Sequence, residues 1–463
     1  MPAEQQLDIC VNTQTPLLLF PAPSSSEGVA SRPPETARLD QLQEGVDYTF
    51  SPGGVTRMVY PLLRRLHEDH FVGEAHWVSL NPFAPREVRM PAFTLHNVSI
   101  AADRLAAYGN VKETIWGTVH GLRRDAPDSA DLFWSDDFSE YAYYNRITAE
   151  KIRGLDAEYD FDLFYIHDFQ QLAIGEMLGT LKPKVYRWHI PFAATDIPSS
   201  WRGAMSSYLN SYDAVVVSTD RYLAQLKEFG YAGRVEKLYP FVDETEYTIP
   251  PADEVTATSA RFGIRPEDRL IVVVGRMDPM KGQDRAIKAL AKLARAHPDV
   301  RLLLVGNGSF SGSSGGLGLS KAGRWRAELE GLARELEIEG RVLFTGHVGQ
   351  RELDACYERA EFTILSSVQE GFGLVVIESW IHGTPVIVSK RAGVAELVKH
   401  RKNALLYDPE DVEALAEAME LLLSDPRGLG RKLAENGAVT ARLCTIDAAA
   451  RAESVLLEGV VNG

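Results

Sequence analysis

Short continuous apolar runs recur along the whole chain, and each is followed by polar or glycine-rich residues and then by apolar residues at helical spacing. Such runs are typical of strands buried on both faces of a parallel sheet. In the first half the pattern predicts strands at residues 7–11, 76–80, 93–98, 161–166, 184–188 and 214–218. In the second half it predicts strands, some with the turn that follows, at 270–274, 300–305, 341–348, 362–365, 386–388 and 403–409. Strands that alternate with helices in two consecutive halves indicate an α/β protein of two doubly wound, Rossmann-like domains.

The chain has 463 residues, which is too long for a single hydrophobic core. A polar segment marked by two prolines, 247–253, separates the halves and is the predicted linker. Polar segments at 21–47 and 309–318 are predicted to be loops, and we expect 24–38 to lie free on the surface. We therefore expect three parts, namely an amino-terminal domain at 1–248, a second domain at 249–440, and a last helix at 441–463 that packs back on the first domain.

Charge and composition argue against some classes of partner and of cellular environment. The formal net charge is −15, which disfavours nucleic acid or an anionic membrane surface as the main partner. Cys10, Cys356 and Cys444 lie far apart, which predicts neither a disulfide framework nor a zinc site and favours a reducing compartment, the cytoplasm. No apolar run approaches the roughly 20 residues that a membrane helix needs, and the first residues lack the pattern of a signal peptide. Association into a homo-oligomer stays open.

The stretch 366–385 is the strongest candidate for a ligand site. It has an acid at Glu370, a Gly-Phe-Gly turn, an apolar helical run, and a second acid at Glu378. Glycines at a helix start leave backbone N–H groups bare, and such a helix start binds anions. A glutamate near a helix start is often only a cap, but two acids eight residues apart around Gly-Phe-Gly favour a ligand.

Arg276 and Lys281 share one turn after the predicted strand 270–274. Two cations at the carboxyl end of a strand can neutralise a diphosphate, and in open α/β sheets ligands bind at that end. The competing interpretation is an ion pair with Asp278 or Asp284, which are the nearest acids in the sequence. We favour the phosphate role.

In the first half, polar side chains follow two strands. His167 and Asp168 follow the strand 161–166, and His189 follows 184–188. A single histidine at a strand end is more often structural, but two such ends in neighbouring units favour a site. A glycine pair, Gly53-Gly54, precedes another predicted helix and is compatible with either a ligand contact or a plain turn.

The motifs of the second half resemble those of retaining GT-B glycosyltransferases, whose two facing domains have a cleft between them. The motifs that carry this resemblance are GRMDPMKG, LLVGNG, LFTGHV, EGFGLVVIE and HGTPVI. The first half is similar to the trehalose-phosphate synthase branch, through its long first loop before the glycine pair and through NRITAEKI, FYIHDF and RWHIPF. The resemblance extends over nearly the whole chain.

The resemblance implies a role for each matching residue. Arg276 and Lys281 would bind the donor diphosphate, Glu378 would accept the ribose hydroxyls, and Glu370 would hold the donor sugar. The other positions implied to contact the donor are Gly371, Phe372, Gly373 and Leu374 for the sugar, Gly53 and Gly54 for the phosphates, and the backbone of His347 and Val348 for the base. His189 would lie at the hydroxymethyl end of the donor sugar, and Asp168 would face the acceptor.

The implied reaction is transfer of a hexose, glucose foremost, from UDP-, GDP- or ADP-hexose to a small polar acceptor, with retention and without a required metal or cofactor. One position departs from the trehalose-phosphate branch, where an Asn-Arg pair follows the first strand and the Arg helps to hold the acceptor phosphate. Here the pair is Asn12-Thr13, so a free sugar, a polyol or a hydroxy acid is an alternative acceptor. A nucleotide-sugar epimerase and a non-catalytic nucleotide-sugar-binding protein are the competing functions.

Overall fold

The computed structural model describes residues 6–21, 35–51, 53–120, 132–195, 197–307, 317–425 and 428–463, without the side chains of residues 102 and 317–320. The chain divides into two compact units, Met1–Tyr239 with Ala449–Gly463, and Pro240–Ala448. The segment 247–253, the predicted linker, lies inside the second unit. The last helix, α14 (Ile446–Val461), enters the first unit from Ala449 onward.

The first unit is built on a mostly parallel sheet, whose only antiparallel pair among the described strands is β6 with β7. Its strands, in spatial order, are β11 (Arg234–Lys237), β10 (Ala214–Val217), β9 (Lys184–Arg187), β8 (Leu163–His167), β1 (Leu7–Asn12), β5 (Val72–Leu80), β7 (Phe93–Val98), β6 (Glu87–Met90) and β3 (Thr36–Arg38). The chain order reverses where β1 lies between β5 and β8, which makes the gap between β1 and β8 the switch point of a doubly wound sheet.

Two expectations about the first unit were incomplete. The stretch 24–38, expected to be free on the surface, ends in β3, which pairs in parallel with β6; residues 22–34 lie outside the described part of the chain. Within the segment predicted as a loop at 21–47, residues 39–41 also form a helical turn, and a small hairpin of β2 (Leu18–Leu19) and β4 (Thr49–Phe50) brackets the segment.

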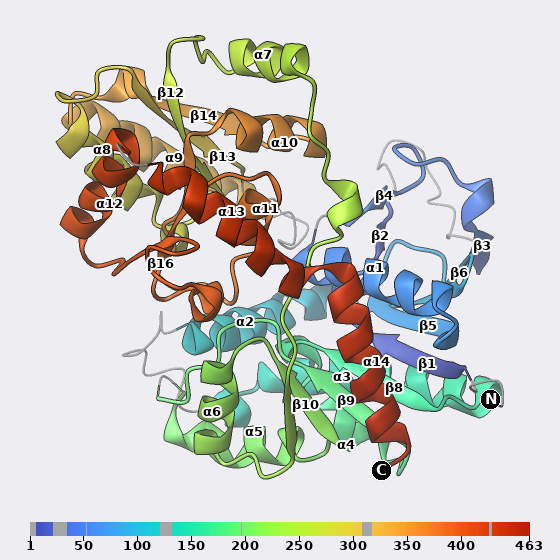
Figure 1. The fold of residues 1–463 in the computed structure, drawn as a ribbon. Coiled ribbons are helices and arrows are strands. Elements are labelled where there is room, and N and C mark those ends of the chain that lie inside the picture. Colours follow the sequence, from blue (N-terminus) through green and yellow to red (C-terminus); the bar gives the residue numbers. More distant parts are fainter. Residues whose placement is uncertain are drawn as a thin grey trace. The chain divides into compact units, whose positions relative to one another are not determined.

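Helices cover the first sheet and bury the positions that the sequence pattern indicated. In α1 (Gly54–Glu68) the buried side chains include Met58, Val59, Leu62, Leu63 and Leu66, which share one face of the helix. The other helices of this unit are α2 (Ala102–Val119), α3 (Phe138–Tyr159), α4 (Ile174–Leu178), α5 (Arg202–Leu209), α6 (Asp220–Phe229) and the greater part of α14. Figure 1 shows α14 beside β8 and β9.

The second unit is built on a fully parallel sheet. Its strands, in spatial order, are β14 (Val342–Gly346), β13 (Val300–Val305), β12 (Arg269–Val274), β15 (Phe362–Leu365), β16 (Val386–Ser389) and β17 (Leu405–Tyr407). The chain order reverses between β12 and β15, so the switch point lies there.

The helices of the second unit pack around this sheet (Figure 1). They are α7 (Ala252–Arg261), α8 (Gln283–Leu293), α9 (Leu317–Glu335), α10 (Gln350–Arg359), α11 (Leu374–Ile381), α12 (Val412–Ser424) and α13 (Leu429–Ala441). The segment predicted as a loop at 309–318 lies outside the described residues up to 316, and α9 begins at Leu317. The predicted α/β class with two doubly wound sheets is confirmed.

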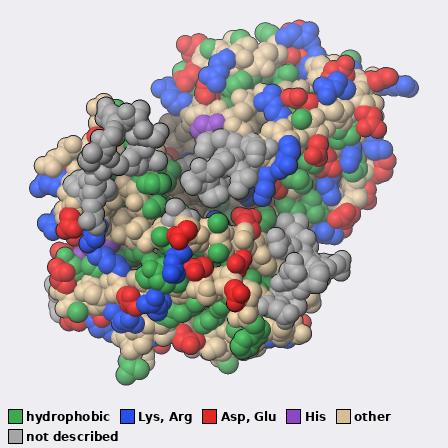
Figure 2. All heavy atoms as spheres, turned by 180° about the vertical axis from the view of Figure 1, so that it is seen from behind, with side chains coloured by type: hydrophobic (Ala, Val, Ile, Leu, Met, Phe, Trp, Pro, Cys, Tyr) green, Lys and Arg blue, Asp and Glu red, His purple; other side chains and the backbone are tan. Residues whose placement is uncertain are grey.

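Neither sign of charge dominates the face drawn in Figure 2. Figure 2 shows acidic and basic side chains interspersed over that face. Among the described residues, no helix is both long enough and apolar enough to cross a bilayer.

Candidate active-site residues

In the second unit, the predicted diphosphate residues and the first acid of the 366–385 stretch follow the two strands that border the switch point. Arg276 and Lys281 come after β12, and Glu370 comes after β15. The ammonium Nζ of Lys281 lies 2.5 Å from Oε2 of Glu370, although the two residues are 89 positions apart in the sequence. The sheet topology therefore brings these two predicted site residues into direct contact.

The carboxyl of Glu370 is held in its charged form. Burial opposes ionisation, but the charge and hydrogen bond of Lys281, the Ser367 hydroxyl and the charge of Arg276 outweigh it and lower the pKa of Glu370. The Ser367 hydroxyl donates to the same oxygen, Oε2, at 3.0 Å. Because an ammonium has three N–H donors, Lys281 keeps donors for a second acceptor while it is bonded to Glu370.

The local ion pairs that competed with the phosphate role do not form. Asp278 accepts a hydrogen bond from the backbone N–H of Met280 at 2.9 Å. Asp284 instead pairs with two other residues of α8, Arg285 and Lys288. The side chain of Arg276 is exposed, so it is accessible to a ligand.

The turn before α11 brings backbone close to backbone, which explains its glycines. Gly373 has φ 104° and is the N-cap of α11 without a side-chain cap bond. Its carbonyl accepts the N–H of Val376 at 3.0 Å, but no cap side chain bonds the N–H groups of the first turn. A Cβ at Gly393 would lie 2.2 Å from the carbonyl oxygen of Gly371. The turn is bonded to the chain after β16, since Val394 N–H donates to the carbonyl of Phe372 at 2.8 Å.

The second acid, Glu378, is held by two tyrosines that the sequence patterns did not reveal. Tyr357 donates its hydroxyl to Oε2 of Glu378 at 2.7 Å, and Tyr247 donates to Oε1 at 3.2 Å. Thr248 bonds Asp354 of α10 through both its N–H and its hydroxyl. The segment of the predicted linker is therefore anchored beside the carboxylate that the family resemblance assigns to the ribose. Tyrosines at these positions carry no sequence signal, because their contacts depend on the fold.

His347 and Val348 follow β14, the strand at one edge of the second sheet. Gly346, the last residue of that strand, accepts a bond from the N–H of Gly306 at 3.0 Å. These residues are therefore on the same carboxyl side of the sheet as Arg276 and Glu370, three strands from β15.

In the first unit, Asp168 directly follows β8 at the switch point and has an unusual backbone. Its φ is 71° and its ψ is 164°, a region that essentially only glycine occupies without strain. Asp168 is 8% exposed, and burial raises the pKa of its carboxyl to about 7 against the opposing effect of the backbone N–H groups of Phe169 and His189. Strain of this kind persists at functional sites where the surrounding structure enforces it.

His189 lies beside His167, and the two imidazoles are stacked. Nδ1 of His167 is 3.0 Å from Nε2 of His189. Burial lowers the pKa of both imidazoles well below the ordinary value, and the positive charge of Arg187 acts in the same direction. Because the backbone N–H of His189 also lowers the pKa of the Asp168 carboxyl, the structure brings the predicted pair, Asp168 and His189, together.

The glycine pair precedes α1 as predicted. Gly53 is the N-cap without a side-chain cap bond, and a Cβ at Gly54 would meet nothing within 4 Å. The Thr56 hydroxyl donates to the carbonyl of Gly53 at 2.8 Å. The helix start is therefore open at Gly54, as a ligand contact requires.

Thr13, which stands at the position that departs from the trehalose-phosphate branch, is buried and carries no charge. Thr13 is 1% exposed. Its hydroxyl accepts from Nε1 of Trp77 at 2.8 Å and donates to the carbonyl of Thr15 at 2.6 Å. The proton of this hydroxyl is therefore already donated inside the protein.

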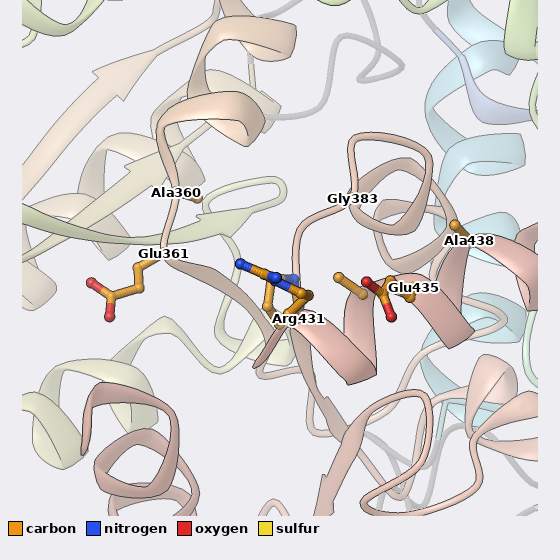
Figure 3. A pocket seen from close by; sticks show the side chains of 8 residues that line it. Ala360, Glu361, Gly383, Arg431, Glu435 and Ala438 are labelled. Atoms are coloured by element: carbon orange, nitrogen blue, oxygen red, sulfur yellow. The ribbon is translucent and has the colours of Figure 1, made fainter. Parts of the chain in front are cut away.

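A pocket of about 510 Å³ in the second unit is lined by none of the predicted site residues (Figure 3). Its lining comes from the residues just before β15 and β16 and from α13, namely Ala360, Glu361, Gly383, Pro385, Arg431, Ala434, Glu435 and Ala438. These are the amino ends of the strands, whereas Glu370 follows the carboxyl end of β15, so this pocket is separate from the predicted site. In the described part of the chain, no group of three or more His, Cys, Asp or Glu is arranged to hold a metal ion.

Comparison with known proteins gives two family matches. Residues 255–440 match the family Glycosyl transferases group 1, and residues 132–224 match Trehalose synthase, N-terminal domain. The D-inositol 3-phosphate glycosyltransferase of Corynebacterium urealyticum is 33% identical over 232 residues, which are 49% of this chain and 52% of that protein. The chain thus spans about half the length of the curated relatives it matches.

Solved structures match nearly the whole chain. The UDP-forming alpha,alpha-trehalose-phosphate synthase from Burkholderia xenovorans, in complex with glucose-6-phosphate, has a TM-score of 0.74 at 17% identity and covers 97% of this chain and 100% of its own. A structure from E. coli, described as trehalose-6-phosphate bound with UDP-2-fluoro glucose, has a TM-score of 0.71 at 17% identity and covers 91% and 98%. At such identities the likeness concerns the fold, and the predicted two-sheet GT-B fold is confirmed.

Proposed function

We propose that this chain, which belongs to the group 1 glycosyltransferases, transfers a hexosyl group from a nucleoside-diphosphate hexose to a small polar acceptor with retention of configuration. The observation that carries the proposal is the contact of Lys281 with Glu370 beside Arg276, after the two strands that border the switch point of the second sheet. This is where an open α/β sheet binds its ligand.

The donor is bound by the second unit in this proposal. Arg276 and Lys281 bind the diphosphate, and the uncapped N–H groups at the start of α11 assist them. Glu370 accepts hydroxyls of the sugar, and Glu378, held by Tyr247 and Tyr357, accepts the ribose hydroxyls. The backbone of His347 and Val348 contacts the base. UDP-hexose is the first donor to test, since a neighbouring structure is described as bound with UDP-2-fluoro glucose.

The chemistry follows from charge. As the glycosidic bond to the donor breaks, negative charge grows on the departing diphosphate, and cations already in place stabilise that charge. Lys281 is held in position by Glu370, so its side chain needs to move little as this negative charge develops. The acceptor oxygen bonds to the anomeric carbon on the face from which the diphosphate leaves, and the proton of the acceptor hydroxyl passes to the departing diphosphate. This preserves the configuration without a protein nucleophile. Asp168 and His189 of the first unit receive the acceptor and the hydroxymethyl end of the donor sugar, and the open helix start at Gly53 and Gly54 contacts the phosphates.

The acceptor is proposed to be unphosphorylated, with free glucose or another hexose first and polyols or hydroxy acids next. The position after β1 that carries a cation in the trehalose-phosphate branch is Thr13, whose hydroxyl is bonded to Trp77 and Thr15. A phosphate there would meet no positive charge from this residue. Part of the first unit matches Trehalose synthase, N-terminal domain, which agrees with a free sugar.

The decisive experiment compares transfer and donor hydrolysis by the wild type with Arg276→Ala and Lys281→Ala, using a panel of nucleotide sugars with glucose and glucose 6-phosphate as acceptors. Removal of one fixed charge from the leaving group should lower kcat by roughly 100- to 1,000-fold. The matched control is Lys292→Ala, an exposed lysine of α8 that pairs with Glu413, and it should keep wild-type kcat. Wild-type turnover in both site variants would refute the assignment. A product without a new glycosidic bond would indicate an epimerase, and tight donor binding without turnover would indicate a binding protein.

A further inference from the structure

A single buried carboxylate on the last helix bonds two neighbouring strands of the first sheet. Oε2 of Glu453, in α14, lies 2.7 Å from Nη1 of Arg187, the last residue of β9. The other oxygen, Oε1, accepts the hydroxyl of Tyr165 in β8. The side chains of Arg187 and Glu453 are 3% and 1% exposed, so this network is shielded from water.

These two strands lead directly to the proposed acceptor-side residues. Tyr165 is three residues before Asp168, and Arg187 is two residues before His189. His167 of β8 is aligned with Arg187 of β9, and the N–H of Asp168 donates to the carbonyl of Arg187 at 2.8 Å. Any shift of Arg187 would therefore move the backbone that holds Asp168.

The network is not explained by stability alone. A buried ion pair is often no more stable than a well-packed apolar pair of the same volume. Nη2 of Arg187 is also buried and, among the described residues, has no hydrogen-bond partner. At the same time the strained backbone of Asp168 requires surroundings that enforce its conformation.

We infer that Glu453 is a positioning residue for the proposed transfer, which fixes the carboxyl ends of β8 and β9, and so Asp168 and His189, through Tyr165 and Arg187. This inference rests on the proposed function. It gives the carboxyl-terminal helix a part in the acceptor side of the reaction, although Glu453 acts only through other residues.

The test must separate positioning from folding. Glu453→Gln keeps the size of the side chain but leaves the buried charge of Arg187 without its acid, so this variant can fail to fold. The informative variant is the double replacement Arg187→Met with Glu453→Leu, which supplies an apolar pair of similar volume. We expect it to fold, with a somewhat lower melting temperature because the buried Tyr165 hydroxyl loses both partners, and to keep the donor KM. We expect kcat to fall by about 10- to 100-fold because the reacting groups are displaced, and the acceptor KM to rise.

A matched control uses another contact of the same helix, the one between α14 and Arg234 of β11. Nη1 of Arg234 donates to the carbonyl of Gly459 at 3.0 Å, so Arg234→Gln loosens α14 without touching β8 or β9. It should leave kcat and both KM values unchanged. Wild-type kcat and acceptor KM in the folded double variant would overturn the inference, and so would an equal loss in the Arg234 control.

A second readout does not depend on activity. The imidazole NMR signals of His167 and His189 should shift in the double variant and stay in place in Arg234→Gln. If the wild type transfers no hexose to any acceptor, the proposed function fails, but the imidazole signals still decide whether Glu453 positions these residues. Unchanged signals in the double variant would overturn the positioning role.

Discussion

The buried carboxyl of Asp168 should make the stability of the protein depend on pH in a way that one substitution removes. Burial raises the pKa of this group from the ordinary 3.8 to about 7. Because the folded state favours the neutral form, the contribution to stability is fully present below about pH 4 and is lost as the pH rises through about 7. A shift of about 3 pKa units at 1.36 kcal/mol each amounts to about 4 kcal/mol across this range.

Asp168→Asn isolates this effect. The amide has nearly the shape of the neutral carboxyl, and its oxygen can still accept the N–H of Phe169, which is 3.0 Å from Oδ1 of Asp168. The amide does not ionise, so the variant should gain about 4 kcal/mol of unfolding free energy over the wild type between pH 4 and pH 8. The assay is urea unfolding at closely spaced pH values, followed by circular dichroism and tryptophan fluorescence.

The control for the pH series is Asp136→Asn, which changes an exposed aspartate of the same unit. Its unfolding free energy should follow the wild type at every pH. Parallel pH curves for Asp168→Asn and the wild type would refute the reasoning, because they would mean that the carboxyl is not held neutral. Loss of transfer together with a gain in stability at pH 8 would show that Asp168 is retained for function at the expense of stability.

Three further substitutions test other parts of the structure. Asp168→Gly should be more stable than Asp168→Ala by about 1–2 kcal/mol in denaturant unfolding, because glycine removes most of the backbone strain at φ 71° but is itself more flexible when unfolded; equal stabilities would contradict the strain. Gly282→Ala should destabilise by at least about 1–3 kcal/mol, since φ is +65° and a Cβ would lie 2.1 Å from the carbonyl oxygen of Ser366; a wild-type melting temperature would contradict this. Tyr247→Phe should weaken nucleotide binding to the proposed site by about 0.5–1.5 kcal/mol through loss of one hydrogen bond to Glu378, measured by calorimetry, and unchanged affinity would mean that Tyr247 does not position that carboxylate.

The central strands of both sheets could be predicted because they are buried on both faces. A strand of this kind is a continuous apolar run, and the predicted ranges 93–98, 300–305 and 362–365 agree with β7, β13 and β15 to the residue. Sequence reasoning missed β3, β6 and β11, which lie at the two edges of the first sheet. The four residues of β11, Arg-Val-Glu-Lys, are mostly polar and partly exposed. Strands at the edge of a sheet commonly carry charged side chains, so this composition does not distinguish β11 from a loop. Only its pairing with β10 identifies it as a strand.

The proposed site could be predicted in part, for a topological reason. Polar residues at the carboxyl ends of strands are visible in the sequence, but which ends meet depends on the strand order. The partner of Lys281 is Glu370, 89 residues away, and not the acids within the same turn. Glu453 was missed because it lies in an ordinary helical pattern, where nothing distinguishes a buried carboxylate from a solvated one. Contacts over such distances become visible only in the fold.

The pKa values of the two acids that follow the switch-point strands, Glu370 and Asp168, are shifted in opposite directions, and we expect different tasks for them in the proposed reaction. Lys281 and Arg276 hold the pKa of Glu370 below its ordinary value, so it remains a charged acceptor throughout the working range. Burial holds the pKa of Asp168 at about 7, so it can change its protonation state near neutral pH. In the proposed site, the ionised carboxylate of Asp168 would accept a hydrogen bond from a hydroxyl of the acceptor more strongly than the neutral acid does, and the rate of transfer should therefore rise as the pH passes about 7. Donor binding, measured by calorimetry over the same range, should not follow this curve, and a transfer rate that is flat between pH 6 and pH 8, or that keeps its slope in Asp168→Asn, would show that another group controls the reaction.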